Sequence, residues 1–239
     1  MHAARLAQVK GQVAAYALAL AMILPGGLVL SASAYALAED TVPPAAESPA
    51  APVAAANLVL EGFRSARFGM SEDEVRAAIE ADFGLSGDAV VPGTNAAERT
   101  QLLTVVVPDL LPEGGAAQIS YVFGYSTKAL IQVGISWSAD IDPSVDAARL
   151  YANSDVLVAY FTAAGYQPAT IRTGLVLDNG ILLFRGEDAD GHATVLLLQG
   201  DYVGGATEGQ RVLQPTSLAL LYAADSQAPD IFTVAPGQF

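Results

Sequence analysis

The chain contains no cysteine, and its 11 lysine and arginine residues are outnumbered by 25 aspartate and glutamate residues. The absence of cysteine excludes a disulfide framework, a thiolate metal site, a cysteine nucleophile and a lipid-modified cysteine. With a net charge of −14, the protein lacks the basic surface that binds phosphate backbones. We therefore expect no nucleic-acid binding and no direct binding to anionic lipid.

Histidine is also scarce, which bears on catalysis because histidine is the usual general base near neutral pH. Only His192 falls in the predicted folded region, beside Gly191 in a predicted turn. There is no G-x-S-x-G elbow, no phosphate-binding P-loop, and no G-x-G-x-x-G after a predicted strand. We predict a protein that is not an enzyme and uses no cofactor. A hydrolase that depends on two carboxylates is kept as an alternative, because the sequence does not show which acids converge.

Residues 1–38 have the pattern of a secretory signal peptide. Arg5 and Lys10 precede a wholly apolar run over 13–24, and Ala36-Leu37-Ala38 offers a small-x-small cleavage site. Cleavage would remove two cations and no acid, so the remaining chain would be still more acidic. This pattern predicts a periplasmic or secreted protein of a Gram-negative bacterium.

An uncleaved N-terminal segment is the alternative, since residues 13–38 are long enough to anchor the protein in the inner membrane. The protein would then be a membrane-anchored accessory subunit. Residues 39–57 are rich in proline and alanine and show no apolar periodicity, which predicts a flexible linker. The folded region is expected over residues 58–239.

Two helices are predicted in this region. The first opens with a capping box formed by Ser71 and Glu74, presents Val75 and Ile79 on one face, and stops at Gly84. The second is predicted over residues 143–164, with Asp142 as its cap and Pro143 in its first turn. Leu150, Leu157 and Phe161 recur there at helical spacing.

Strands are predicted from alternating or continuous apolar runs bounded by turn residues. Asp178-Asn179-Gly180 predicts a type I′ hairpin, and residues 124–128 have the length of a second hairpin turn. The predicted strands cover residues 102–107, 118–123, 129–137, 170–177, 181–185, 194–198, 217–222 and 231–234.

The order of elements predicts a two-layer α+β fold in which helices pack on one face of an antiparallel sheet. Residues 62–140 and 141–239 have similar lengths and the same element order. A tandem helix–β-meander duplication is therefore a further hypothesis.

Residues 68–75, F-G-M-S-E-D-E-V, resemble the G-M-[ST]-x-x-[EQ]-V helix start of small envelope lipoproteins related to the barrel-assembly accessory protein BamE. The order of helix and hairpins is similar to that of the β-lactamase inhibitor protein. The resemblance covers one helix start and an element order, and it implies a binding or assembly role. This chain departs from the lipoprotein pattern because it has no cysteine to carry a lipid.

Three side chains are candidates for binding a partner. Arg64 and Arg67 precede the first helix and could engage carboxylates of a partner, or they could pair internally with Glu61 or Glu72. Trp137 ends a predicted strand, where a core or sheet-edge position is more common than a contact with a partner.

Asp188 and Asp190 are weak candidates for a metal site because D-x-D-G places oxygens at alternate positions. The bidentate glutamate of a full calcium loop is missing, so we predict a polar hairpin turn and no metal.

The sequence as a whole favours a non-enzymatic protein that binds another envelope or secreted protein. A periplasmic small-molecule or lipid-binding module is the main alternative. Its pocket would lie between helices and sheet and be lined by residues such as Leu182, Phe184 and Tyr222.

Overall fold

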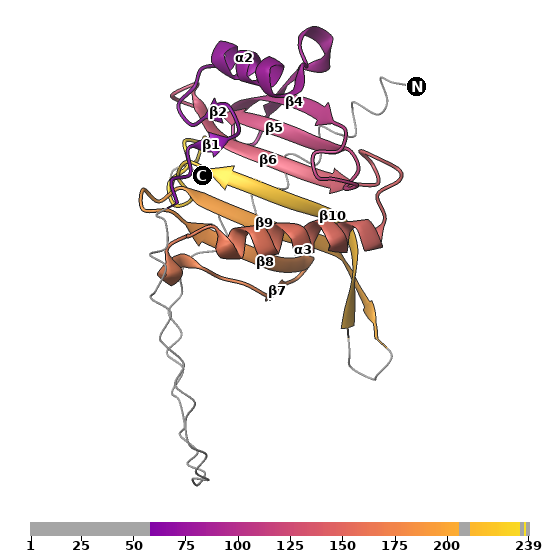
Figure 1. Cartoon of the computed structure of the whole chain (residues 1–239). Coiled ribbons are helices and arrows are strands. Elements are labelled where there is room, and N and C mark those ends of the chain that lie inside the picture. Colours follow the sequence, from indigo (N-terminus) through magenta and orange to yellow (C-terminus); the bar gives the residue numbers. More distant parts are fainter. Residues whose placement is uncertain (1–57, 206–210, 235–236, 238–239) are drawn as a thin grey trace, which may run out of the picture.

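The computed structural model describes residues 58–205, 211–234 and 237. They form a mixed α/β fold with an eight-stranded antiparallel sheet, a two-stranded sheet and two α-helices (Figure 1). The predicted signal peptide, 1–38, and linker, 39–57, lie outside the described residues. Within the described part, none of the helices combines the length and the apolar character needed to cross a membrane.

The eight-stranded sheet has the order β3-β4-β5-β6-β10-β9-β8-β7, so β6 and β10 pair at its centre. The elements in chain order are β1 (Gly62–Phe63), β2 (Ala66–Arg67), α2 (Glu72–Phe83), β3 (Val91–Asn95), β4 (Thr100–Val107), β5 (Ala117–Phe123), β6 (Leu130–Ser138), α3 (Ala147–Ala163), β7 (Leu175–Leu177), β8 (Gly180–Glu187), β9 (Ala193–Gly204) and β10 (Arg211–Ala223).

Helix α2 forms as its local sequence predicts. Ser71 is the N-cap, its hydroxyl accepts a hydrogen bond from the Glu74 backbone N–H, and the Glu74 carboxylate accepts from the Ser71 backbone N–H at 2.8 Å. Gly84 ends the helix with a φ of 67°, in the left-handed region that glycine tolerates. Both ends of this helix are thus specified by residues within the helix or next to it.

The predicted start of the second helix at Asp142-Pro143 is wrong, because α3 begins later and has Asp146 as its N-cap. Asp142 accepts instead from the backbone N–H groups of Ala116 and Ser144, each at 2.9 Å. These hydrogen bonds hold the pKa of Asp142 below its ordinary value. Asp142 therefore joins two loops that are distant in sequence.

Six predicted strands are confirmed with shifted ends, as β4, β5, β6, β8, β9 and β10. The predicted strand at 170–177 shortens to β7, because a 3₁₀ turn at Pro168–Thr170 opens that segment. Asp178 and Asn179 join β7 to β8 as predicted, but neither has a positive φ, so the predicted turn type is wrong. The predicted strand at 231–234 does not form.

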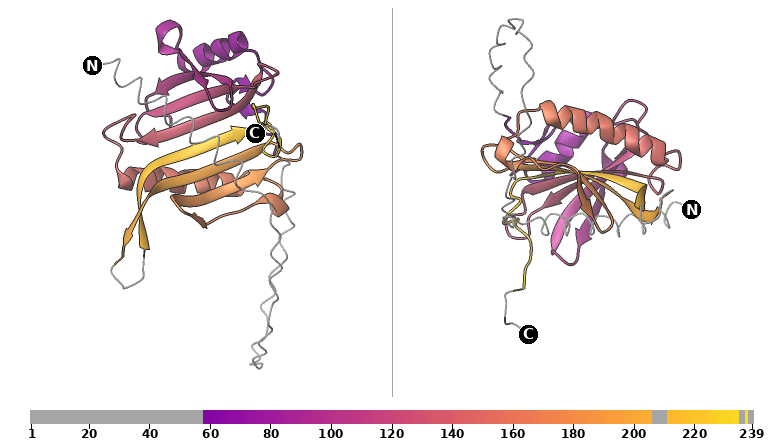
Figure 2. Two further views of the ribbon diagram at one scale, coloured as in Figure 1. Left: turned by 180° about the vertical axis from the view of Figure 1, so that it is seen from behind. Right: turned by 90° about the horizontal axis from the view of Figure 1, so that it is seen from below.

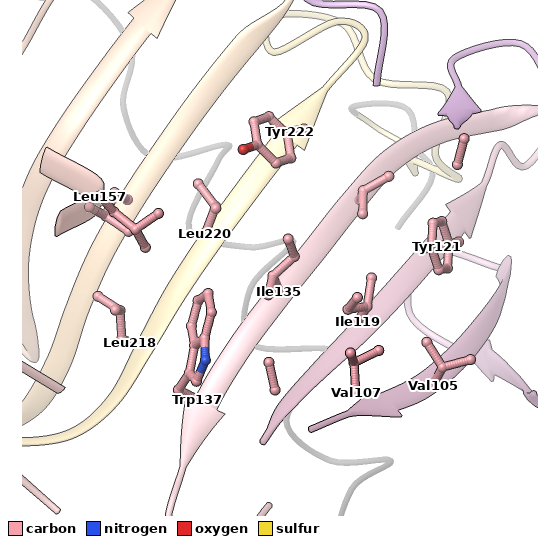
Figure 3. Packing of buried hydrophobic residues seen from close by; sticks show 14 of the residues in the cluster. Val105, Val107, Ile119, Tyr121, Ile135, Trp137, Leu157, Leu218, Leu220 and Tyr222 are labelled. Atoms are coloured by element: carbon pink, nitrogen blue, oxygen red, sulfur yellow. The ribbon is translucent and has the colours of Figure 1, made fainter. Parts of the chain in front are cut away.

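Buried side chains occupy both faces of the large sheet. On one face, Ile119, Ile135 and Leu220 belong to the main hydrophobic cluster (Figure 3). The same cluster contains Ile79 of α2 and Phe161 of α3. Figure 2 shows α3 lying along one side of the sheet, and its contacts are with β8, β9 and β10. A second, smaller cluster lies on the opposite face and consists of Leu182, Val195, Leu197, Ala219, Leu221 and Ala223.

Candidate functional site

Helix α3 presents an unusually apolar surface to solvent. Its inward residues Leu157 and Phe161 are buried, whereas Tyr151, Val156 and Tyr160 have exposed fractions of 42%, 57% and 65%. A surface helix normally directs charged or polar residues outward. The other exposed residues of α3 carry one charge, that of Asp155, and are Ala147, Ala148, Ala152, Asp155, Ala159, Thr162 and Ala163.

We call Tyr151, Ala152, Val156, Ala159, Tyr160 and Ala163 the α3 surface. Ala152, Val156, Ala159 and Ala163 follow one another at spacings of three or four residues along the solvent side of the helix, and Tyr151 and Tyr160 lie at the two edges of that side. Alanine side chains between the larger ones leave room for close approach of a second backbone.

The N-terminal half of α3 is fixed to the long β9–β10 hairpin. The Tyr151 hydroxyl donates to the backbone carbonyl of Leu213 on β10 at 3.1 Å. Within the helix, the Ser154 hydroxyl donates to the Tyr151 carbonyl at 2.7 Å. The Tyr151 ring is therefore held in place at one end of the α3 surface.

A cavity of about 360 Å³ lies at the other end of α3. It is bounded by the segment 58–64, by the end of α3 and by β10. Tyr160, Phe161, Tyr166 and Tyr222 supply aromatic walls. Its volume is near the lower end of the range of roughly 300–1,000 Å³ typical of ligand pockets.

The aromatic walls contact one another in defined geometries. Phe63 stacks on Tyr222 with ring centroids 5.8 Å apart, and Phe161 stacks on Phe184 at 5.5 Å. The Tyr166 hydroxyl donates to the Thr194 hydroxyl at 2.6 Å. These contacts fix the shape of the cavity, because Phe161, Tyr166 and Tyr222 also pack in the main hydrophobic cluster.

Of the residues expected to line a pocket in the small-molecule alternative, Tyr222 lines this cavity. Phe184 lies behind Phe161 in the main hydrophobic cluster and does not line it. Leu182 belongs to the cluster on the opposite face of the sheet. The β-bulge between Leu182 and Phe184 changes the alternation, so the two side chains point to different faces.

The two candidate arginines have different surroundings. Arg67 forms an exposed ion pair with Glu61, as the internal-pairing interpretation predicts. Arg64 contributes to the cavity, and its guanidinium lies 4.7 Å from the ring centroid of Phe83 and 5.7 Å from that of Phe63. Among the described residues no carboxylate forms an ion pair with Arg64.

Trp137, the third candidate for partner binding, is 1% exposed and packs in the main core beside Ile135 and Leu218 (Figure 3). A partner cannot reach its side chain in this structure. Its ring packs in the hydrophobic layer of β6.

Asp188, Asp190 and His192 come together in the turn between β8 and β9, where one possible ligand atom from each lies within 4.8 Å of the others. One Asp188 oxygen accepts from the backbone N–H groups of Asp190 and His192, each at 2.9 Å. The other accepts from the Leu60 backbone N–H at 2.8 Å and lies 3.1 Å from His192 Nδ1. Both Asp188 oxygens thus have hydrogen-bond partners within the protein.

His192 lies in the predicted turn, and its side chain is only partly exposed. Its imidazole packs against Phe68 with ring centroids 5.3 Å apart. Burial opposes the ionisation of Asp188, but hydrogen bonds from Leu60 and His192 outweigh it and lower the Asp188 pKa. Through its hydrogen bond from Leu60, Asp188 connects the segment 58–64 to the turn between β8 and β9 of the large sheet.

The hydrolase alternative requires two acids that face each other in a cleft, each with a raised pKa. Over the residues that the structure describes, burial raises the pKa of one carboxylate, that of Glu98, and the side chain that bonds to this carboxylate is an amide and not a second acid. The Glu98 carboxylate accepts from the Asn95 side-chain amide at 2.8 Å, and the Glu98 backbone carbonyl accepts from the Phe232 N–H at 2.9 Å. These contacts connect the β3–β4 turn to the C-terminal segment.

No family model, no curated protein and no solved structure matches this chain. The resemblance to BamE-like lipoproteins and to the β-lactamase inhibitor protein stays a prediction.

Proposed function

We propose that this chain is an exported, non-enzymatic accessory protein that binds another envelope or secreted protein, with the α3 surface as its contact. The observation that carries the proposal is that Tyr151, Val156 and Tyr160 are exposed on one helix, whose exposed residues carry one charge, that of Asp155. Tyrosine is enriched at binding interfaces because its ring buries a large area at small entropic cost.

The charge of the protein indicates the character of the partner. A net charge of −14 disfavours association with another strongly acidic surface. A partner with an apolar centre and a basic rim would match both the α3 surface and the acidic groups around it, such as Asp146 and Asp155.

We also propose the two-layer, duplicated arrangement. Buried Val75 and Ile79 of α2 share one cluster with Leu157 and Phe161 of α3, which supports placing both helices on the same face of the sheet. The strand order supports duplication, because strands β3 to β6 come from residues 62–140 and strands β7 to β10 from residues 141–239. The two sets meet only where β6 pairs with β10.

Co-purification of the C-terminally tagged chain from gently solubilised cell envelope tests the binding function. Val156→Glu places a charge in the α3 surface, while Val176→Glu changes a valine of similar exposure, 60%, on β7. We expect a stoichiometric protein companion with the wild-type chain and with Val176→Glu, and at least a tenfold loss with Val156→Glu.

Intact-mass measurement of the same samples shows whether residues 1–38 are removed, which separates a periplasmic partner from an anchored subunit. The absence of any companion, or one retained equally by Val156→Glu, would contradict the proposed function.

A further inference from the structure

The cavity at the end of α3 is lined by Tyr222, whose hydroxyl forms no hydrogen bond with the described residues. Tyr222 is 9% exposed. Its neighbour Tyr166 satisfies its own hydroxyl through Thr194. The Tyr222 hydroxyl is not among the fully buried side-chain atoms that lack a hydrogen-bond partner, so it keeps access to the cavity and can bond to a ligand there.

The Tyr222 hydroxyl is held in its protonated form. Burial is the main cause that raises its pKa, so at neutral pH it offers a neutral O–H donor. The ring itself is fixed between Phe63 and Phe161, whose centroids lie 5.8 Å and 6.3 Å from that of Tyr222. The donor is therefore prepositioned at the cavity wall.

The charged residues of the cavity give a second constraint. Glu61 and Arg64 both contribute to its lining, but the Glu61 carboxylate is already paired with Arg67. The Arg64 guanidinium lies over the rings of Phe63 and Phe83 and forms no ion pair among the described residues, and its φ of 53° is the left-handed conformation of the turn between β1 and β2. A cation without an ion-pair partner thus lies at an aromatic cavity in an otherwise acidic protein.

We propose that this cavity binds a small monocarboxylate with an aromatic body. The body lies in the cavity against the walls formed by Tyr160, Phe161 and Tyr166, an oxygen of the ligand accepts from Tyr222, and the negative charge faces Arg64. The inference goes beyond the protein-binding function, because the segment 58–64, α3 and β10 form the cavity within this chain, so ligand binding does not require a macromolecular partner.

Cinnamate and its uncharged analogue cinnamamide are suitable probes. Binding to the purified full-length chain is measured by saturation-transfer NMR and by calorimetry. We expect cinnamate to bind and cinnamamide to bind about fivefold more weakly, the effect of one exposed ion pair. Equal binding of the two would contradict the role of Arg64, and no saturation transfer to either probe at millimolar concentration would overturn the proposal.

Variants locate the site. Tyr222→Phe keeps the ring and removes the hydroxyl, so it should weaken cinnamate binding about 2- to 10-fold. Arg64→Gln should weaken it about fivefold, whereas Arg211→Gln, which changes an exposed arginine that does not line the cavity, should leave it unchanged. An unaltered affinity of Tyr222→Phe for cinnamate would contradict the proposed hydrogen bond from the Tyr222 hydroxyl to the ligand.

A filling variant tests the cavity itself. Ala164 lines the cavity, while Ala163 is exposed and does not line it. Ala164→Leu should reduce cinnamate binding at least about tenfold and Ala163→Leu should not, with thermal melting used to confirm that both variants are folded. Equal binding of cinnamate by Ala164→Leu and Ala163→Leu would show that the ligand does not bind in this cavity. Because Val156→Glu should bind cinnamate normally, failure of this inference and failure of the proposed function are distinguishable.

Discussion

Replacement of Phe161 by alanine should be among the most damaging changes to the fold. Its ring is 1% exposed and contacts Phe184, Tyr166 and Tyr222 at centroid distances of 5.5, 6.3 and 6.3 Å. Truncation of a buried phenylalanine typically costs about 3–5 kcal/mol. Aromatic pairs add about 0.5–1.5 kcal/mol each, which places this site toward the upper end of that range.

Such a loss is a large fraction of the roughly 5–15 kcal/mol by which domains are stable. Urea unfolding can be followed by the emission of Trp137, the single tryptophan of the chain, which is buried. For a slope of about 2 kcal/mol per molar urea, the midpoint of Phe161→Ala should fall by about 1.5–2.5 M.

Tyr160→Ala is the matched control, since it removes a neighbouring ring that is 65% exposed. It should cost no more than about 1 kcal/mol. Equal midpoints for Phe161→Ala and Tyr160→Ala would refute the assignment of Phe161 to the centre of the core.

Three further predictions concern local structure. Ser71→Ala should destabilise the protein by about 1 kcal/mol in urea unfolding, because Ser71 caps α2, and Ser86→Ala should not, because Ser86 precedes a 3₁₀ turn without a side-chain capping bond. Gly180→Ala would place its Cβ 2.3 Å from a backbone carbonyl of β9 and should cost about 1–3 kcal/mol, while Gly204→Ala meets open space and should be neutral by the same assay. Hydrogen bonds from the turn before β6 lower the pKa of Asp230 to about 2. Its contribution to stability should therefore be complete above about pH 4 and lost as the pH falls toward 2, so the urea midpoints of wild type and Asp230→Asn should converge at low pH.

The parts of the fold that could be predicted are those specified by neighbouring residues. The capping box at Ser71 and the stop at Gly84 bound α2, and both are recognisable from residues that are close in sequence. The start of α3 was misjudged because Asp142 has the sequence signature of a cap but bonds across the fold to Ala116. Strand β3 was missed because Pro92-Gly93 is typical of a turn, although an edge strand tolerates proline.

The candidate sites depend on contacts that sequence periodicity does not encode. Residues 58–64, Tyr166 and Tyr222 meet at the cavity although they are far apart in the chain. The apolar character of the α3 surface can be read from the sequence, since Val156 and Tyr160 lie next to the buried positions Leu157 and Phe161. Its exposure cannot, because a helix with apolar residues on all sides is also typical of a helix that is buried on all sides.

The central pairing of β6 with β10 has a consequence for the order of folding. Strands β3 to β6 can form by short-range hairpins, but the free edge of β6 has no partner until β10, the last strand of the sheet, becomes available. Until then Ile135 and Trp137 lie beside an unpaired backbone edge, which is prone to pair with other chains. The chain is therefore most vulnerable to aggregation just before its final strand is in place, and slowing the closure of β10 should increase misassembly more than it lowers the stability of the finished fold.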